Sequence, residues 1–112
     1  MYNGFVLKNK TKKTVISKDL KVFKSALEKT LGLLGKKEQT VLFKTRFGIH
    51  TFFLKTPIDV MILNNEYKVV KLKKELRPNR IFLWNPKFEI VIETQSGKIK
   101  ESKTEKDDFL EL

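Results

Sequence analysis

The sequence predicts an α+β protein that is mostly β: a compact, barrel-like sheet of mixed or antiparallel strands with one short helix. Many short segments alternate apolar and polar residues, or are apolar throughout, between Gly, Pro and Asn residues, and this is typical of strands. Helical spacing of apolar residues occurs at one place. With 112 residues, 40% of them hydrophobic, the chain is expected to form a single domain, residues 1–112.

The helix is predicted at about 25–35. Apolar residues recur there at helical spacing, namely Leu20, Phe23, Leu27, Leu31 and Leu34. Ser25 and Glu28 have the spacing of a capping box, in which the Ser oxygen accepts one orphan amide and the Glu reaches back to another. Gly35 is predicted to end the helix, because glycine readily adopts the left-handed conformation of a helix C-terminus.

Strands are predicted over most of the remaining chain. They cover residues 4–8, 14–16 with a continuation at 20–23, 40–43, 49–54, 58–63, 67–72, 81–86 and 88–94. Residues 49–54 and 58–63 are apolar on both faces, so we expect both strands to be central and buried on both sides. We expect them to form a hairpin around Pro57. The consecutive Phe52 and Phe53 should then point to opposite sides and pack in the core.

Three motifs resemble one known family. Their sequences are Gly-Leu-Leu-Gly at 32–35, Ile-His-Thr-Phe-Phe-Leu-Lys-Thr-Pro-Ile-Asp-Val at 49–60, and Trp-Asn-Pro at 84–86. From Val41 to Glu93 the chain resembles the uncharacterised bacterial and archaeal family known as domain of unknown function 192. The resemblance implies a compact, mostly β, barrel-like fold with one helix, and it implies no activity.

The chain departs from the family pattern after Glu93. The family's Leu-Pro-Ala-Gly segment is replaced by Thr-Gln-Ser-Gly at 94–97, which keeps only the glycine. Lys106 is expected to stand where the family has the glycine of a closing Gly-Asp pair, with Asp107 after it.

The charge is strongly and unevenly positive. The formal net charge is +11, and residues 1–56 hold 13 basic and 3 acidic residues. A basic half favours an anionic partner, so nucleic-acid or anion binding by the N-terminal half is one hypothesis. The basic residues are mostly Lys and evenly spread, however, and base and phosphate recognition relies more on Arg. We therefore favour a solvated Lys surface.

The composition also excludes several kinds of site. The chain contains no Cys and a single His, so disulfides, thiolate catalysis and zinc sites are not expected. We find no Gly-rich phosphate loop and expect no cofactor. No apolar run approaches the roughly 20 residues of a membrane span, and no signal peptide is recognised, so we expect a cytoplasmic protein without a membrane partner.

Asp59 and His50 are the candidate catalytic residues. Asp59 lies in an apolar strand, where a carboxylate is costly unless it is paired or hydrogen-bonded. It is either an acid or base of an enzyme, or a structural residue that accepts amides after Pro57 or pairs with a cation. We favour the structural role. In the predicted hairpin, His50 lies roughly 10–13 Å from Asp59, which disfavours a direct pair.

A polar and aromatic cluster is the candidate ligand site. It consists of Arg46, Arg77, Arg80, Trp84 and Asn85. With Lys55, some of these residues are also candidate partners of Asp59. The cluster either lines a pocket for an anionic or planar ligand, or forms an ordinary connection whose Trp84 packs in the core. Our leading hypothesis is a non-catalytic module that binds a small molecule or a protein there.

Overall fold

The computed structural model describes residues 5–25, 39–52 and 54–112. The helix predicted at about 25–35 lies outside these ranges apart from Ser25. The described elements are β1 (Phe5–Asn9), β2 (Thr14–Val22), β3 (Val41–Lys44), β4 (Gly48–His50), β5 (Ile58–Leu63), β6 (Val69–Leu76), β7 (Ile81–Leu83), β8 (Ile90–Gln95), α2 (Lys98–Glu101) and β9 (Leu110–Glu111). No helix among the described residues is long and apolar enough to cross a membrane.

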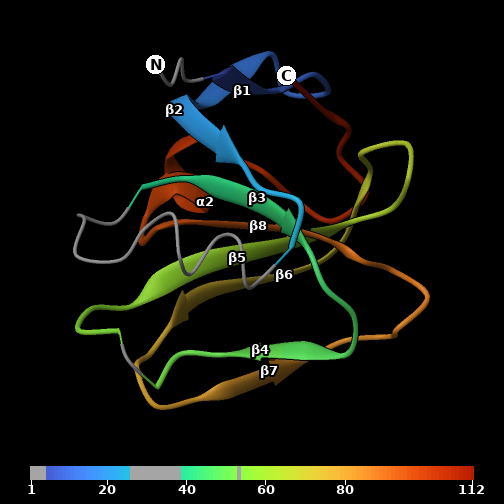
Figure 1. Cartoon of the computed structure of the whole chain (residues 1–112). Coiled ribbons are helices and arrows are strands. Elements are labelled where there is room, and N and C mark those ends of the chain that lie inside the picture. The colour runs from blue at the N-terminus through green and yellow to red at the C-terminus, as the bar shows by residue number, and fades with distance from the viewer. Residues whose placement is uncertain (1–4, 26–38, 53) are drawn as a thin grey trace.

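Seven strands form one curled sheet in the order β6-β5-β8-β3-β2-β1-β9 (Figure 1). Neighbouring strands are antiparallel, except β2 and β3, which run parallel. The two ends of the sheet meet where a bridge joins Lys68 to Phe109. Backbone hydrogen bonds of 2.8 and 2.9 Å connect residues 67–69 with residues 107–110 there. The predicted fold, mostly β with a curled, barrel-like mixed sheet, is confirmed.

Apolar clusters cover both faces of this sheet, and β5 contributes to both. Met61 belongs to the inner cluster, together with Ile99 of α2. Val60 belongs to the second cluster, together with Trp84 and Phe82. Successive residues of a strand point to opposite faces, so a strand between two clusters must be apolar throughout. Every residue of β5 is buried, as predicted.

Strands β4 and β7 form a separate two-stranded ribbon, which lies at the bottom of Figure 1. Its register pairs Gly48 with Leu83, Ile49 with Phe82 and His50 with Ile81. Residues directly opposite each other share a face of an antiparallel pair. Ile49 and Phe82 pack against the second cluster, so the ribbon covers this face of the main sheet, and its other pairs point away from the core.

The prediction for residues 49–54 is wrong. The strand ends at His50 and belongs to the ribbon, and β5 lies between β6 and β8 instead of beside β4. The predicted hairpin around Pro57 therefore does not form. Phe52 is exposed rather than packed in the core, and Phe53 lies outside the described residues. Ile49 packs against the second cluster and Phe52 is exposed to solvent, so the apolar residues of this segment are divided between the core and the surface.

Other predicted strands are present with shifted ends. The segments 14–16 and 20–23 join into the continuous strand β2, and the strand predicted at 81–86 ends at Leu83. The hairpin connection after β5 is present, and Asn64 organises it by accepting the amides of Glu66 and Lys68. These differences concern boundaries and leave the predicted fold class unchanged.

Candidate functional site

Asp59 is a fully buried structural carboxylate. Its Oδ1 accepts the Glu75 amide at 2.9 Å, and its Oδ2 accepts the amides of Gly97 and Ile99 at 3.1 and 3.0 Å. It therefore holds together β5, an irregular point in β6 where Glu75 has a φ of 52°, and the start of α2. The expectation that Asp59 accepts backbone amides is correct. The amides come from distant segments, however, and not from the turn after Pro57.

His50 lies far from this environment in the fold. It is exposed at the end of β4, and its ring stacks on Phe52 with centroids 4.8 Å apart. Asp59 faces α2 on the inner side of the main sheet, whereas β4 lies in the ribbon. The structure therefore does not bring the two candidate catalytic residues together.

The five candidate ligand residues separate into two groups. At one end of the ribbon, Trp84 is buried and donates from Nε1 to the Phe88 carbonyl at 2.9 Å. Asn85 accepts the Lys87 amide in a local turn. The guanidinium of Arg46, also at this end, donates to the Pro86 carbonyl at 2.7 Å and to Glu89 at 3.2 Å. Trp84 therefore packs in the core, and Arg46 and Asn85 make hydrogen bonds within this connection.

Arg77 and Arg80 lie at the other end of the ribbon, and Thr51 fixes the loop that carries them. The Thr51 Oγ1 donates to the Arg77 carbonyl at 2.6 Å and accepts the Arg80 amide at 2.9 Å. The Thr51 amide donates to the Arg80 carbonyl at 2.9 Å, and its carbonyl accepts the Asn79 amide at 3.0 Å. Sequence reasoning missed Thr51, although it lies within the second family motif.

The outward side of the ribbon is an exposed apolar surface, which we call the ribbon face. We define it as His50, Ile81 and Leu83, whose pairs point away from the core, together with Phe52, which stacks on His50, and Phe47, which adjoins Gly48 in the chain. The exposed fractions of its large apolar residues are 65% for Phe47, 63% for Ile81, 62% for Leu83 and 47% for Phe52. Single exposed apolar residues are common, whereas contiguous ones mark interaction sites. Sequence reasoning assigned such residues to strands and could not tell that they face solvent.

Phe47 is held in a strained turn at one end of the ribbon face. The Gly48 amide donates to the Arg46 carbonyl at 2.9 Å across Phe47, whose φ is 75°. A three-residue turn with positive φ at its centre is strained, and bulky residues rarely adopt it. Such strain persists only where the surroundings enforce it, and it concentrates at functional sites.

The surroundings of the ribbon face are predominantly basic, and the nearest acids in sequence are Glu75 and Glu89, of which Glu89 pairs with Arg46. The segments 44–57 and 76–88 contain six basic residues and no acidic residue. All three arginines of the chain, Arg46, Arg77 and Arg80, lie in these two segments. Lys71 adds a further cation from β6, because its Nζ donates to the Leu83 carbonyl at 2.7 Å and lies over the Phe82 ring.

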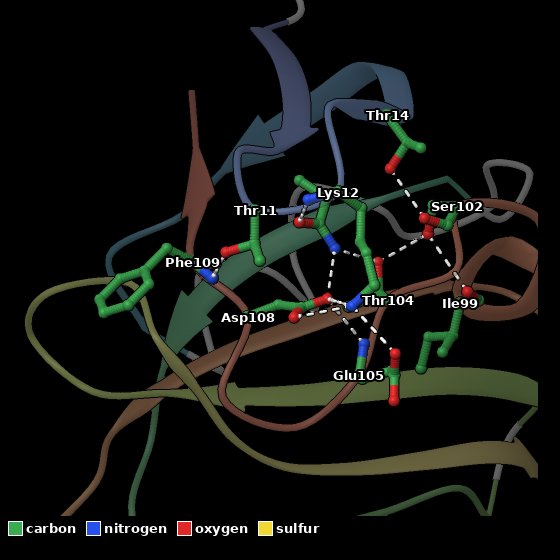
Figure 2. Close-up of polar contacts among 10 residues, drawn as sticks. Thr11, Lys12, Thr14, Ile99, Ser102, Thr104, Glu105, Asp108 and Phe109 are labelled. Atoms are coloured by element: carbon green, nitrogen blue, oxygen red, sulfur yellow. Dashed lines mark hydrogen bonds and ion pairs between the residues drawn. The ribbon is translucent and has the colours of Figure 1, made fainter.

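A second polar cluster, partly buried, joins the β1–β2 turn to the C-terminal segment, as Figure 2 shows. Lys12 Nζ lies 2.8 and 2.9 Å from the two carboxylate oxygens of Asp108 and 3.0 Å from Glu105. Asn9 donates to Asp108 at 2.9 Å and to Thr104 at 3.0 Å. We call these five residues the clasp. It links the β1–β2 turn to the C-terminal segment. Among the described residues, the hydrogen bonds and ion pairs of these side chains do not involve the ribbon.

The clasp shifts the pKa values of its two central groups. Burial opposes ionisation of Asp108, but hydrogen bonds from Lys12, Asn9 and the Glu105 amide outweigh burial and lower its pKa. The hydrogen bonds of Lys12 to Asp108 and Glu105 raise the pKa of Lys12. Both shifts favour the charged forms, so the ion pair persists across neutral pH.

The backbone at the clasp bears on the expected match of the C-terminus to the family pattern. Asp107 has a φ of 77°, the conformation that glycine adopts most readily, and the next residue, Asp108, is the buried carboxylate. These two residues, one position beyond the predicted match at Lys106 and Asp107, have the backbone and the burial that a Gly-Asp pair would suit.

A surface hollow of about 530 Å³ lies between β2, Thr40 and α2. Its walls carry the cations Lys18 and Lys98 and the acids Asp19 and Glu101. No described residue of β4 or β7 lines this hollow. Because its charges are mixed and it lies apart from the ribbon, it does not extend the ribbon face.

Two solved structures share the fold. A protein of unknown function from Novosphingobium aromaticivorans aligns with a TM-score of 0.71 at 14% identity, over 96% of this chain and 82% of that one. A second, from Sinorhizobium meliloti and described as a candidate transcription regulator, aligns with a TM-score of 0.66 at 16% identity, over 83% of this chain and 78% of that one. At these identities the similarity establishes the fold alone.

Sequence comparison identifies the family. The curated "UPF0127 protein PH1112" of Pyrococcus horikoshii is 31% identical over 101 residues, which cover 84% of this chain and 86% of that protein. The model of the family described as "Uncharacterized ACR", domain of unknown function 192, matches residues 6–112. The chain therefore belongs to the family of domain of unknown function 192, whose function is not known.

Proposed function

We propose that this protein is a non-catalytic binding module and that a segment of a partner protein docks on the ribbon face. The observation that carries the proposal is the exposure of Ile81 and Leu83 on the outward side of a small ribbon, with the exposed Phe52 stacked on His50 and the exposed Phe47 next to Gly48 in the chain. Aromatic and apolar side chains with arginines at the margin are the composition that protein interfaces favour. The strained turn at Phe47 supports the same proposal, because it keeps a phenylalanine at the surface.

The shape and charge of the ribbon face favour a protein segment over the other occupants. The described hollow, which would suit a small molecule, is lined by residues of other elements. A second copy of this chain would bring two predominantly basic surfaces together, and like charges oppose such a contact. The exposed aliphatic residues Ile81 and Leu83 suit apolar side chains of a partner better than they suit nucleic-acid bases.

A non-catalytic role is supported by the positions of the candidate catalytic residues. All the hydrogen bonds of the Asp59 carboxylate go to backbone amides within the fold, and the residue is buried. His50 packs on Phe52 at the surface. We further propose a cytoplasmic location, which the absence of Cys supports.

A peptide selection tests this proposal. A random peptide library displayed on phage is selected on the wild-type protein, and the selected peptides are measured on the double variant Ile81→Ser/Leu83→Ser. The matched control is Val15→Ser/Val22→Ser, which removes two exposed valines of β2. We expect the selected peptides to lose binding to the ribbon variant and to keep it with the control.

Three results would contradict the proposal. They are the absence of any enriched peptide, equal binding of the peptides to the ribbon variant and the wild type, and equal loss of binding in both variants. Circular dichroism of both variants verifies that each keeps its strands, so that a loss of binding reports the surface and not unfolding.

A further inference from the structure

We infer that the partner segment is acidic, that Arg77 and Arg80 bind a carboxylate next to its apolar residues, and that Thr51 is the positioning residue for both arginines. This inference rests on the proposed function, and it goes further by naming the chemistry of the partner and the residues that select it. The observation that carries it is the set of five hydrogen bonds between Thr51 and the loop at 77–80.

Thr51 makes the arginine loop rigid. It uses its hydroxyl, its amide and its carbonyl on residues 77, 79 and 80, and it is itself buried. Asn79 has a φ of 61°, which turns the chain sharply between the two arginines. A loop fixed before binding loses less entropy when a ligand binds, so cations on a rigid loop bind anions more tightly than cations on a mobile one.

The two side chains are available for a ligand. Arg77 and Arg80 are exposed, and within the described part of the chain the side chain of Arg77 has no hydrogen bond or ion pair. The Arg80 guanidinium makes a 3.3 Å hydrogen bond to the carbonyl of Asn79, its neighbour in sequence. Arg46, by contrast, is occupied by Glu89 and the Pro86 carbonyl. Guanidinium groups that lack an acidic partner suit carboxylates, which they bind in a forked geometry.

The two arginines lie beside one end of the ribbon face, so the acidic residue of the partner should lie next to its apolar residues. Arg80 directly precedes Ile81, and Thr51 directly follows His50, the residue opposite Ile81. The arginine loop therefore adjoins the end of the ribbon face that Ile81, His50 and Phe52 form. An extended segment that covers Ile81 and Leu83 would present its acidic residue within about three positions of its apolar ones, at roughly 3.3 Å per residue.

A pair of synthetic peptides tests the inference. The first carries leucine and phenylalanine beside a Glu-Asp pair, and the second replaces that pair with Gln-Asn. Isothermal titration measures both on the wild type and on Arg77→Gln/Arg80→Gln. The control variant, Lys8→Gln/Lys18→Gln, removes two exposed lysines of β1 and β2 and so changes the net charge equally.

We expect the acidic peptide to bind the wild type on the order of tenfold more tightly than its amide analogue, an advantage typical of charge-assisted hydrogen bonds. The advantage should disappear in the arginine variant, persist in the lysine variant and shrink with added salt. An equal preference in the two variants would overturn the inference, because it would mean that only net charge matters.

The role of Thr51 is tested by its own pair of variants. Thr51→Val removes the hydroxyl, and Thr51→Ser retains it. We expect the valine variant to lose most of the preference for the acidic peptide while it keeps binding of the amide analogue, and the serine variant to retain the preference. A uniform loss of binding to both peptides in Thr51→Val, or no effect at all, would overturn the positioning role.

The outcomes separate this inference from the proposed function. If neither peptide is preferred, but both require Ile81 and Leu83, the acidic partner is wrong and the binding module stands. If binding is independent of Ile81 and Leu83, both are wrong. A single-stranded oligonucleotide is titrated in parallel. Displacement of the acidic peptide by the oligonucleotide at equal concentration would overturn the inference in favour of nucleic acid.

Discussion

At the scale of single residues, Asp59 is the clearest case of a functional-looking side chain with a structural role. Replacing it by Asn keeps the size but turns an NH₂ group towards backbone N–H donors that now have no acceptor. Because buried unsatisfied donors are costly, we predict that Asp59→Asn lowers the free energy of unfolding by about 2–3 kcal/mol. Urea denaturation measures this change.

The exposed Asp107 provides the control for that experiment. Its carboxylate makes a 3.6 Å ion pair with Lys68 at the surface, and such pairs contribute little. Asp107→Asn should therefore leave the stability almost unchanged. If Asp59→Asn were as stable as the wild type, the structural role of Asp59 would be wrong and its candidacy as an acid or base would return.

The backbone at Asp107 leads to a second prediction at this scale. Its φ of 77° favours glycine, and a Cβ without a compensating hydrogen bond is strained there. We predict that Asp107→Gly is more stable than Asp107→Ala by about 1 kcal/mol. Thermal melting of the two variants measures the difference. Equal melting temperatures would contradict the left-handed backbone conformation at residue 107.

At the scale of elements, the sequence predicts strands more reliably than it predicts their neighbours. Residues 58–63 are apolar on both faces and form a buried strand between two clusters, as expected. Residues 49–54 have the same pattern, yet the strand there is short and lies in the exposed ribbon. The spacing and composition of apolar residues indicate that a strand has two apolar faces. They do not indicate whether protein or solvent covers each face.

The candidate site could be predicted only in part for the same reason. Arg77 and Arg80 were recognised from their residue type and their loop. Trp84 was recognised too, but its side chain packs in the core. The role of Thr51 depends on hydrogen bonds to residues that lie 26 and 29 positions away in the sequence. Local sequence patterns do not reveal such contacts. The ribbon face depends on the register of β4 with β7, which single-sequence reasoning does not determine.

The ribbon itself depends on the absence of a side chain at Gly48. A Cβ there would lie 2.6 Å from Leu83 Cδ2 and 2.7 Å from the Phe82 carbonyl oxygen. We predict that Gly48→Ala separates β4 from β7 and lowers the free energy of unfolding by about 1–3 kcal/mol. Urea denaturation measures the loss, and near-ultraviolet circular dichroism of Trp84 reports the local change.

The double variant Gly48→Ala/Leu83→Ala distinguishes the two contacts. Removing Cδ2 relieves the first contact, but the carbonyl of Phe82 belongs to the backbone and cannot move independently. The double variant should therefore recover only part of the lost stability. Full stability of Gly48→Ala would contradict the close approach of the two strands.

At the scale of the whole molecule, the clasp connects the two ends of the described chain and makes its stability depend on pH. The lowered pKa of Asp108 means that its contribution is present above the ordinary value of 3.8 and is lost as the pH falls through the lower folded value. The raised pKa of Lys12 means that its contribution is present below 10.5 and is lost at higher pH.

We predict that stability falls both in acid and above pH 10.5, with a plateau between these limits. Asp108→Asn should lower the plateau and flatten both limbs, because it removes the partner of Lys12 as well. Urea denaturation over a pH series measures these curves. Wild-type and variant curves of identical shape would show that the ion pair does not contribute to stability.

Among the exposed regions of the described chain, the ribbon face is the one that we propose binds a partner. The direct measurement is an NMR titration of the ¹⁵N-labelled protein with the acidic, apolar peptide. We predict that the amide shifts concentrate at residues 47–52 and 77–83, with little change around Lys18 and Lys98 in the hollow. Shifts concentrated at the hollow or along β1 and β2, with the ribbon unchanged, would contradict the claim.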